Sequence, residues 1–534
     1  METDVLIIGA GVTGCGVMRD LALRGIASLL IDKGDLNAGA SGGNHGLLHS
    51  GGRYAVNDPE AARECRQEGA ILKRIASHCV EDCGGLFVAV EGDDPDYADR
   101  FSDHCGAAGI EHQLLTPAQA ARLEPALSDR VIAACAVPDA TIDPFRLTIE
   151  QVNEARRLTD SRFLPHTELT GFEIAAGEIT EARCRDAKSG ARFTIRARQV
   201  VNTAGAWAMR VARLAGCEDV GLIYAKGTLI ITNTRLTQRV VNRLRPPGDG
   251  DILVPGGTVS LLGTTSDLID DPDGIRPTVG EVDRNLDEGM RMVPALAGTR
   301  FIRAFAGVRP LLSSPDSGAA GRKATRGFSV FDHRDQGLTN FVTVTGGKLT
   351  TFRLMAEKAT DLVAERLGNR EPCRTASEPL TSGDALRWTE SRASARAWFG
   401  RGEQADPILC ECEMVPKSTV DAILSDAPGA EQHMPLKAIA LRSRIGKGSC
   451  QGAFCSIRVT SHLYDREVYA GPDGLRLMRG FLAERHKGIR PVLWGAQLAQ
   501  IELAETLHCG LMGLDLIEPD EGDTAPSDPS GEAA

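Results

Sequence analysis

Four cysteines near the C-terminus stand in two close pairs, Cys410-Glu-Cys412 and Cys450-Gln-Gly-Ala-Phe-Cys455. Two such pairs at a distance are how one chain brings four thiolates to one point, where they can bind a metal ion or an iron–sulfur cluster. Structural zinc sites usually use C-x2–4-C pairs, so the tighter C-x-C pair favours iron–sulfur. Glycines in the segment RSRIGKGSC before Cys450 could offer backbone N–H groups to cluster sulfides. A [2Fe–2S] cluster is expected, with zinc and simple buried thiols as the alternatives.

A second chemical motif lies at the N-terminus, where Gly9-Ala-Gly11-Val-Thr-Gly14 follows the apolar run DVLII. Gly9 permits a tight turn, Gly11 lets the backbone approach a pyrophosphate, and Gly14 lets a helix pack on a strand. The helix that follows offers free N–H groups to phosphate oxygens. A second apolar strand, 27–31, ends at Asp32, near the distance at which a carboxylate accepts from a ribose 2′-hydroxyl. The pattern predicts a dinucleotide site, and NAD and FAD both use it.

The two motifs together decide between the dinucleotides. An iron–sulfur centre takes one electron at a time, whereas a nicotinamide gives two as a hydride. A flavin can accept a hydride and release single electrons. FAD is therefore the expected dinucleotide.

Composition supports a large α/β enzyme. The chain has 534 residues with 58 glycines and only 4% aromatic residues, which favours several domains with many tight turns. The net charge is −12, and the acidic tail 518–534 contributes much of it. No basic run indicates nucleic-acid binding. We expect no signal peptide and no transmembrane segment, and the fourteen cysteines indicate a reducing cytoplasm rather than a disulfide framework.

The elements that would position these motifs follow from periodicity. Residues 37–57 are expected to form a Gly/Ser/His-rich loop that adds nothing to the core, and 59–83 and 143–158 to form helices. VVNTAGAW at 200–207 indicates a strand ending in a glycine turn. Residues 219–315 alternate as an antiparallel sheet that could roof a cofactor, and 341–368 indicate strand, glycine turn and helix. The expected domains are an oxidoreductase domain (1–368), a linker (369–407), a cysteine module (408–460), a helical segment (461–516) and a disordered acidic tail (517–534).

Several longer motifs resemble one enzyme family. They are DVLIIGAGVTGCGVMRDLALRG, NHGLLHSGGRY, DPFRL, VVNTAGAW, DILVPGGTVSLLGTTS, AGVRPLL and TVTGGKLTTFRLMAE. Over residues 1–515 the chain resembles FAD-dependent glycerol-3-phosphate dehydrogenases, most closely the A subunits of the anaerobic enzymes, and its cysteine module resembles the bacterioferritin-associated-ferredoxin type of [2Fe–2S] domain. That type usually has C-x2-C as its second pair, whereas this chain has C-x4-C.

The resemblance implies a fold and an activity. The fold is α/β: a Rossmann-type FAD-binding domain with an antiparallel-sheet substrate domain, like D-amino-acid oxidase, followed by the iron–sulfur module and a helical tail. The activity is oxidation of glycerol 3-phosphate at C2 to dihydroxyacetone phosphate, with electrons passing toward membrane quinone. The implied partners are the B and C subunits of the anaerobic dehydrogenase complex. The first would carry a flavin such as FMN, and the second would be membrane-bound. The chain would then be cytoplasmic and peripheral on the inner face of the membrane.

The substrate residues can be weighed on their own chemistry. A phosphomonoester is a dianion near neutral pH, and forked guanidiniums suit it. Arg53, Arg309 and Arg326 stand in loop or strand-end contexts, GGRY, GVRP and ATRG. By resemblance they lie with Tyr54 and Lys348 where the family holds substrate. The respiratory relatives often have KGSH in a substrate strand, whereas this chain has KGTL at 226–229, so that histidine's role does not carry over.

Two further side chains are candidates for the reaction itself. Lys348 opens a helix, where a cation is unfavourable unless an anion lies opposite. His49 lies in the glycine-rich loop and is a candidate base for the C2 hydroxyl, or else a hydrogen-bonded loop histidine. The expected catalytic residues are thus Arg309, Lys348 and His49. The expected FAD-binding residues are Gly9, Gly11, Gly14, Asp32, Lys33, Ser41, Ala204, Gly205, Gly346, Gly347, Leu349 and Thr350.

The sequence leaves two other functions open. One is an FAD dehydrogenase for another hydroxy or amino acid on the same fold, but a carboxylate needs one arginine and several are present. The other is a non-catalytic flavin/iron–sulfur redox sensor, which would lack a substrate cage or carry a nucleic-acid-binding element.

Overall fold

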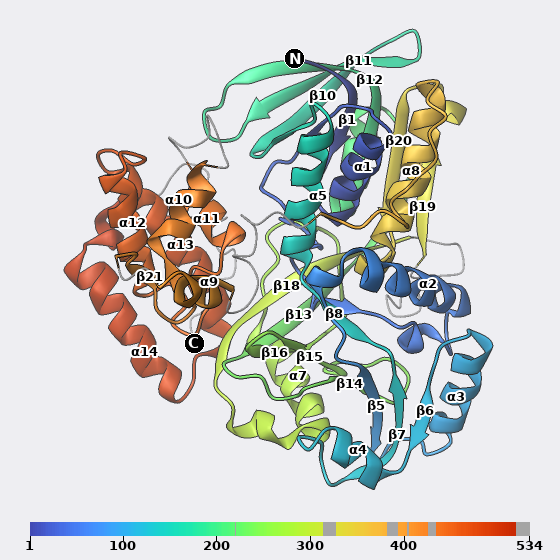
Figure 1. Cartoon of the computed structure of the whole chain (residues 1–534), viewed down its shortest axis with the longest axis vertical. Coiled ribbons are helices and arrows are strands. Elements are labelled where there is room, and N and C mark those ends of the chain that lie inside the picture. Colours follow the sequence, from blue (N-terminus) through green and yellow to red (C-terminus); the bar gives the residue numbers. More distant parts are fainter. Residues whose placement is uncertain (219, 313–326, 382–392, 403–404, 426–433, 519–534) are drawn as a thin grey trace. The chain divides into compact units, whose positions relative to one another are not determined.

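The computed structural model of the chain describes all residues except 219, 313–326, 382–392, 403–404, 426–433 and 519–534 (Figure 1). The residues divide into two compact units. Unit 1 comprises 1–272, 280–299 and 305–383, and unit 2 comprises 273–279, 300–304 and 384–534.

The nucleotide-binding part of unit 1 is built on an eight-stranded sheet in the order β10-β11-β12-β1-β2-β9, with β20 beside β12 and β19 beside β20. β1 pairs in parallel with β2 and with β12, and β12 with β20. The strands are β1 Glu2–Ile8, β2 Ser28–Ile31, β9 Arg162–Leu164, β10 Thr167–Ala175, β11 Glu178–Asp186, β12 Arg192–Asn202, β19 Phe328–Asp332 and β20 Phe341–Gly346. The strands expected at 4–8, 27–31, the start of 200–207 and the start of 341–368 are confirmed.

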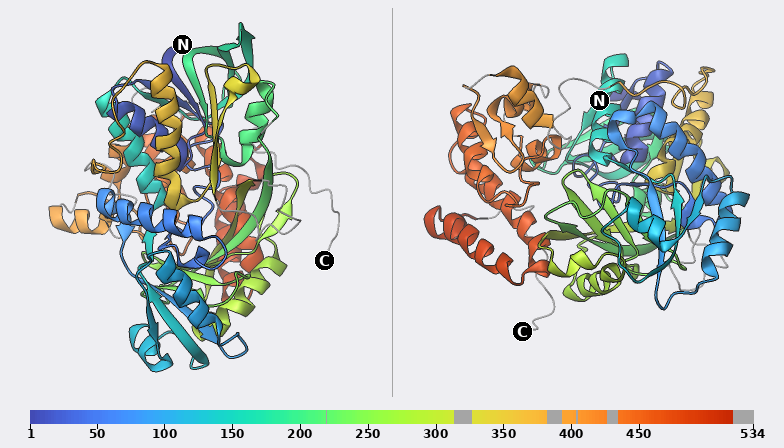
Figure 2. Two further views of the ribbon diagram at one scale, coloured as in Figure 1. Left: turned by 90° about the vertical axis from the view of Figure 1, so that its right-hand side faces the viewer. Right: turned by 60° about the horizontal axis from the view of Figure 1, so that its bottom comes forward.

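Helix α1 (Val12–Leu23) packs between α5 (Pro144–Leu158) and α8 (Phe352–Arg366) on this sheet. Figure 2 shows α1, in dark blue, beside the gold α8 from two further sides. The start of α5 follows from its sequence, because the Asp143 carboxylate accepts from the N–H groups of Phe145 and Arg146 and Pro144 occupies the first turn. The remaining helices of unit 1 are α2 Pro59–Ile75, α3 Tyr97–Ala107, α4 Pro117–Leu123, α6 Ala208–Leu214 and α7 Val279–Met292.

The second sheet has nine strands in the order β17-β13-β16-β15-β14-β5-β7-β6, with β18 beside β13. The antiparallel strands expected within 219–315 are present, but the sheet differs from the expectation in two respects. β5–β7 come from residues 85–137, and β14 pairs with β5 in parallel. The strands are β5 Gly85–Val90, β6 Gln113–Leu115, β7 Val131–Val137, β13 Leu222–Thr232, β14 Val240–Arg243, β15 Ile252–Gly256, β16 Val259–Gly263, β17 Asp267–Ile269 and β18 Phe301–Leu312.

The glycine-rich loop 37–57 contributes to the core, contrary to expectation. Leu47 and Leu48 form the short strand β3, are almost fully buried, and pair with β8 (Ala140–Ile142), which also pairs with β4 (Val80–Glu81). Apolar side chains in a loop rich in small residues can thus pin it to the fold, and here they fix the segment that carries His45 and His49.

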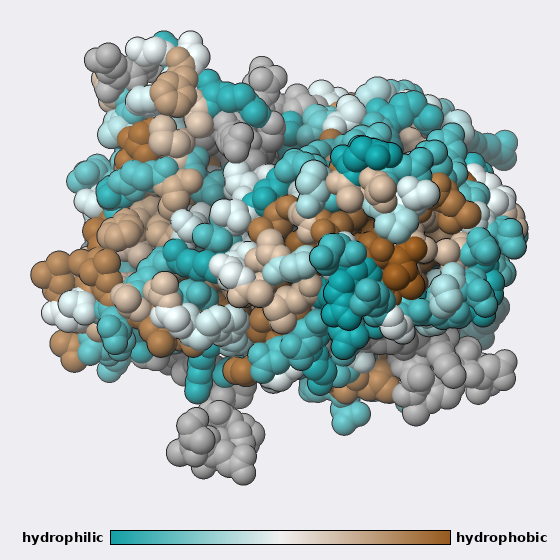
Figure 3. Space-filling view, turned by 90° about the horizontal axis from the view of Figure 1, so that it is seen from below, coloured by the Kyte–Doolittle hydropathy of each residue, from teal (hydrophilic) through white to brown (hydrophobic). Residues whose placement is uncertain are grey.

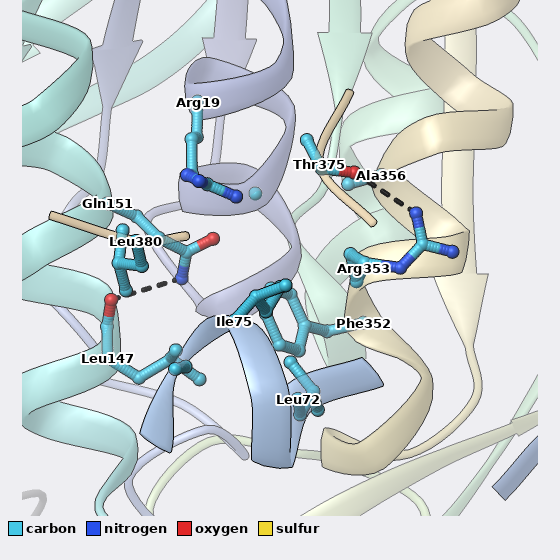
Figure 4. A pocket seen from close by; sticks show the side chains of 12 residues that line it. Arg19, Leu72, Ile75, Leu147, Gln151, Phe352, Arg353, Ala356, Thr375 and Leu380 are labelled. Carbon is cyan, nitrogen blue, oxygen red and sulfur yellow. Dashed lines mark hydrogen bonds between the residues drawn. The ribbon is translucent and has the colours of Figure 1, made fainter. Parts of the chain in front are cut away.

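The expected linker 369–407 begins as a packed part of unit 1. The Leu380 N–H donates to the Ile75 carbonyl (2.7 Å), and Leu380 is buried. Leu380 and Thr375 line a cavity of about 10 Å³ between α1, α2, α5 and α8. Figure 4 shows these two side chains among the others that line it. The Arg353 guanidinium donates to the Thr375 hydroxyl there (3.0 Å). The cavity has room for about one water molecule, so it is a packing defect and not a ligand site.

Unit 2 holds a small helical core behind the hairpin β21–β22. Its apolar core includes Leu409, Cys410, Val415, Ile439 and Phe481. The elements are α9 Ala393–Arg401, β21 Ile408–Cys410, β22 Val415–Pro416, α10 Lys417–Ser425, α11 Leu436–Arg442, α12 Cys455–Asp465, α13 Asp473–Ile489 and α14 Ala496–Glu505. The helices expected within 461–516 are confirmed. The expected disordered tail lies outside the described residues but for its start.

Among the described residues, no helix combines the length and apolarity that a bilayer crossing requires. The face drawn in Figure 3 mixes hydrophilic and hydrophobic residues.

Candidate active site

The turn between β1 and α1 requires glycine for steric reasons that the structure makes explicit. Gly9 has φ +107°, and a Cβ on it would lie 2.7 Å from the Thr203 carbonyl oxygen. A Cβ on Gly14 would lie 2.0 Å from the Gly9 carbonyl oxygen. A Cβ on Gly11, in contrast, would approach only the Ser41 side chain, at 3.0 Å. The first and third glycines therefore serve packing, and the second lets the Ser41 hydroxyl lie close to the backbone at the start of α1.

Ser41 and Asp32 complete this turn. The Val12 N–H at the start of α1 donates to the Ser41 hydroxyl (2.9 Å). The Asp32 carboxylate accepts from the Ala10 and Gly34 N–H groups, both at 2.7 Å. Burial raises the pKa of Asp32, and these two backbone hydrogen bonds oppose the rise. Both carboxylate oxygens therefore face backbone N–H groups of the turn, and their remaining lone pairs are available to a ribose hydroxyl.

The other expected FAD-binding residues lie where β12 and β20 end, beside the end of β1. The Gly205 carbonyl accepts from the Thr345 hydroxyl (3.1 Å), which joins the two strand ends. Gly346 and Gly347 have φ +86° and +70°, so the turn after β20 needs both glycines. Thr350 accepts from the His49 N–H (3.2 Å). Lys33 lies 4.6 Å from the centre of the Trp207 ring, a cation–π distance. Ala204 precedes Gly205 and Leu349 precedes Thr350 in these same turns.

Arg309 is held on β18 by the loop 264–265. Its Nη1 donates to the Thr265 carbonyl (3.2 Å), and its Nη2 contacts the Thr264 hydroxyl. A Cβ on Gly227 would lie 2.5 Å from Nη2. Gly227 belongs to the KGTL segment. Any side chain at this position would collide with the guanidinium, so glycine is needed for Arg309 to lie there.

Three of the other expected residues form a connected group. The Lys348 Nζ lies 5.1 Å from the centre of the Tyr54 ring. The Tyr54 hydroxyl lies 3.5 Å from His49 Nε2, and the two rings are 5.1 Å apart. The structure therefore brings together a cation, a phenol and an imidazole at the turn after β20.

The remaining two arginines are placed differently. Arg53 Nη2 lies 3.6 Å from the buried Asp251 carboxylate, which also pairs with Arg245 at 2.7 Å. Part of its charge is thus offset within the protein. Arg326 lies outside the described residues.

His45 is a site residue that the sequence analysis missed. Burial, followed by the positive charges of Arg309 and Arg53, lowers the pKa of His45 to about 3. The His45 and His49 rings are 6.1 Å apart. A second histidine four positions before His49 in the same glycine-rich loop was the available signal.

Four cysteines of unit 2 converge as expected from their spacing: Cys410, Cys412, Cys450 and Cys455. The sulfur atoms of Cys412 and Cys450 are 3.3 Å apart. Hydrogen bonds from the Cys412 and Cys455 thiols lower the pKa of Cys410 and of Cys450, while the pKa values of Cys412 and Cys455 are raised. Each sulfur thus has two cysteine neighbours, and the group shares its protons as a four-thiol donor set would.

Backbone N–H groups near the four cysteines are placed to stabilise thiolates that bind a metal centre. Gly446 and Glu413 hydrogen-bond to Cys410 through their backbone N–H groups. A Cβ on Gly448 would lie 2.8 Å from the Cys412 sulfur. Cys410 and Cys455 are buried, whereas Cys412 is exposed. The donor set fits four-thiolate ligation of a metal ion or an iron–sulfur cluster.

Another potential metal-binding group lies in unit 1. One ligand atom each of His78, Cys79 and Glu150 lie within 4.8 Å of one another. Glu150 also accepts from the Arg146 guanidinium (3.0 Å), and His78 contacts Glu150 directly. The positive charge of Arg146 opposes a metal ion there, so we interpret the group as a buried ion-pair network.

Comparison with known proteins decides the family. A model of FAD-dependent oxidoreductases (DAO) matches residues 4–362. The A subunit of the anaerobic glycerol-3-phosphate dehydrogenase of Escherichia coli K12 is 41% identical over 540 residues, covering 97% of this chain and 98% of the relative. The A1 subunit of the anaerobic enzyme of Haloferax volcanii is 38% identical over 96% of this chain and 91% of its own length.

The chain belongs to the family of anaerobic glycerol-3-phosphate dehydrogenase A subunits. Its cofactor is FAD, as expected from the sequence. A solved structure shares the fold: the glycerol-3-phosphate dehydrogenase from Bacillus halodurans complexed with FAD has a TM-score of 0.65 and 21% identity, covering 92% of this chain and 96% of that one. The L-α-glycerophosphate oxidase from Mycoplasma pneumoniae, with FAD bound, has a TM-score of 0.55 over 72% of this chain and 97% of that one.

Replacing Gly11 with valine should abolish FAD binding. The new side chain would press against Ser41 and crowd the start of α1, where the pyrophosphate must approach the backbone. We expect the purified variant to carry less than about a tenth of the wild-type flavin, measured by absorbance after denaturation. Gly298→Val is the control, because a Cβ there meets no atom within 4 Å. Wild-type flavin content in Gly11→Val would contradict the assignment.

Proposed function

We propose that this chain oxidises glycerol 3-phosphate to dihydroxyacetone phosphate and passes the electrons through a [2Fe–2S] cluster toward membrane quinone. The observation that carries the proposal is that unit 1 contains both Arg309 and the connected group His49–Tyr54–Lys348. The chain also belongs to a family whose relatives are named for this activity. Oxidation of a small phosphorylated alcohol requires a cation that binds the phosphate and a base that accepts the hydroxyl proton. These side chains supply both.

The protein's own residues have separate tasks in this reaction. The β1–α1 turn, Asp32 and the turn after β20 hold FAD, which accepts the hydride from C2 when bound. Arg309 holds the substrate phosphate; the role of Arg326 in anion binding stays a prediction from the sequence, because Arg326 lies outside the described residues. His49 accepts the proton of the C2 hydroxyl, with Tyr54 beside its Nε2. Lys348 neutralises negative charge that develops on the substrate oxygen or the cofactor. Arg53 lies at the margin, because Asp251 already compensates it in part.

The cysteine module has a different task. We infer that Cys410, Cys412, Cys450 and Cys455 hold a [2Fe–2S] cluster, which would carry electrons one at a time. Support comes from the convergence of the four sulfurs and from the backbone N–H groups beside them. Zinc remains the alternative occupant, and metal and sulfide analysis separates the two.

We also infer that the chain works with partners. Its relatives are named as A subunits, which implies further subunits. A B subunit, with a flavin such as FMN, and a membrane-bound C subunit that reduces quinone would hold this chain as a peripheral protein on the cytoplasmic face.

Anaerobic mixing of the flavin-loaded chain with glycerol 3-phosphate should bleach the visible absorbance of the oxidised flavin. Glycerol, glycine and L-proline serve as comparison substrates, since glycine oxidases and an L-proline dehydrogenase share the fold. Bleaching by an amino acid but not by glycerol 3-phosphate would overturn the proposal, and bleaching by none of them would favour a redox sensor.

A further inference from the structure

The glycine-rich loop that carries His45 runs against β18, the strand that carries Arg309. A Cβ on Gly307 would lie 2.0 Å from the Gly43 carbonyl oxygen, so the loop and the strand touch through their backbones. His45 follows Gly43 by two residues, and Arg309 follows Gly307 by two. The positive charges of both Arg309 and Arg53 act on the His45 ring, which shows that the imidazole lies within their field.

The same loop is fixed internally. The Asn44 side-chain amide donates to the Ala40 and Ser41 carbonyls, and its oxygen accepts from the Gly46 N–H (2.7 Å). The Gly46 carbonyl accepts from the Ile142 N–H (2.7 Å). His45 is therefore held at both neighbouring residues, and its ring position is a property of the fold.

One hydrogen bond decides the tautomer of His45. The Leu47 N–H donates to Nδ1 (3.3 Å). A neutral imidazole that accepts at Nδ1 carries its proton on Nε2. Because Nδ1 is an acceptor and two guanidiniums disfavour a further cation, His45 is a neutral donor and cannot act as a base through Nε2.

We propose that His45 donates a hydrogen bond from Nε2 to the phosphate group that Arg309 binds, and so determines the preference for phosphorylated substrates. This inference rests on the proposed function. A neutral donor adds a directed hydrogen bond without placing a third positive charge beside two guanidiniums. The ring is only partly exposed, so the bond would form out of bulk water.

Neutrality has a consequence for pH dependence. The pKa of His45 is lowered to about 3, below the usual value of about 6.5. The imidazole therefore stays neutral above about pH 5, so protonation of His45 itself should not alter phosphate binding between about pH 6 and 9. The charged groups that face it are Arg309 on β18 and Arg53 after β3. His49 is its other ring neighbour.

The test is a binding titration of the oxidised, FAD-loaded chain with dihydroxyacetone phosphate, followed by the change in the flavin spectrum. His45→Gln keeps a neutral donor near the position of Nε2. His45→Asn keeps an acceptor for the Leu47 N–H but cannot reach as far. We expect His45→Asn to weaken binding by about 10- to 100-fold, the scale of a hydrogen bond to a charged group, and His45→Gln by less than about threefold. Dihydroxyacetone, which lacks the phosphate, should bind all three proteins alike.

Controls separate the possible failures. Equal flavin content shows that each variant is folded, and the exposed His104→Gln controls for a general histidine effect. Equal weakening by Asn and Gln, or by neither, would overturn the proposal, as would a wild-type advantage over His45→Gln that grows as pH falls from about 7 to 6. If wild-type flavin is bleached by glycerol 3-phosphate but the variants bind like wild type, only this inference fails. If wild type is not bleached, the proposed function fails.

Discussion

Replacing Arg309 with lysine should lower kcat/KM for glycerol 3-phosphate by about 30- to 1,000-fold, or about 2–4 kcal/mol of transition-state stabilisation. The guanidinium is planar and is oriented by the Thr265 carbonyl and the Thr264 hydroxyl. Lysine keeps the positive charge. It lacks the planar guanidinium, which can donate to two phosphate oxygens while the threonine contacts keep it oriented. The phosphate is the only charged group of a flexible three-carbon substrate. Loss of the bidentate hydrogen bonds to it therefore also misplaces C2.

Steady-state kinetics with an artificial electron acceptor would measure this loss. Arg196→Lys is a matched control, because Arg196 forms an exposed ion pair with Glu181 and exposed pairs contribute little. Glycerol, which lacks the phosphate, should be a poor substrate that responds little to Arg309→Lys or to Arg326→Ala. A specificity constant for glycerol 3-phosphate within twofold of wild type in both arginine variants would show that the anion site lies elsewhere.

The parts of the fold that local signals specify were predictable. Three segments show this: the β1–α1 turn, the strand ending in VVNTAGAW and the strand–turn–helix at 341–368. Each contains apolar residues at the spacing of its strand or helix, together with the glycines of its turn. Sheet membership was not predictable in the same way. The parallel pairing of β14 with β5 joins residues far apart in the chain, and no periodicity within either strand specifies its partner.

The residues of the candidate site likewise divide into those that the local sequence predicts and those that only the fold reveals. Arg309 and Lys348 could be proposed because their contexts, GVRP and GGKL, are unusual for a solvated cation. The Arg53–Asp251 contact could not, because the partner carboxylate is remote in sequence. His45 was missed for a related reason: its neutrality depends on burial and on two guanidiniums, and only the fold supplies both.

The cysteine module allows a test that separates reduction of the flavin from its reoxidation. Cys410 is fully buried at the end of β21, and Cys412 and Cys455 hydrogen-bond to its sulfur. Serine at this position would replace a soft thiolate by a hard oxygen that is protonated at neutral pH, and soft thiolates are the ligands that iron–sulfur clusters select. The buried site leaves little room for another group to take over as the ligand.

Replacing Cys410 with serine should therefore remove the cluster while leaving FAD in place. Wild type should contain about two iron and two sulfide per chain, the content of a [2Fe–2S] cluster, and the variant should contain less than about a tenth of each. Anaerobic bleaching of the flavin by glycerol 3-phosphate should proceed at the wild-type rate, because the substrate residues lie in unit 1. Reoxidation by a one-electron acceptor should slow by at least about tenfold, since the flavin then lacks its single-electron route. Cys373→Ser is the control, because Cys373 lies in unit 1 and contacts Thr375 instead of another cysteine. One zinc and no sulfide in wild type, or unchanged iron in Cys410→Ser, would replace the redox interpretation of these four cysteines with a structural one.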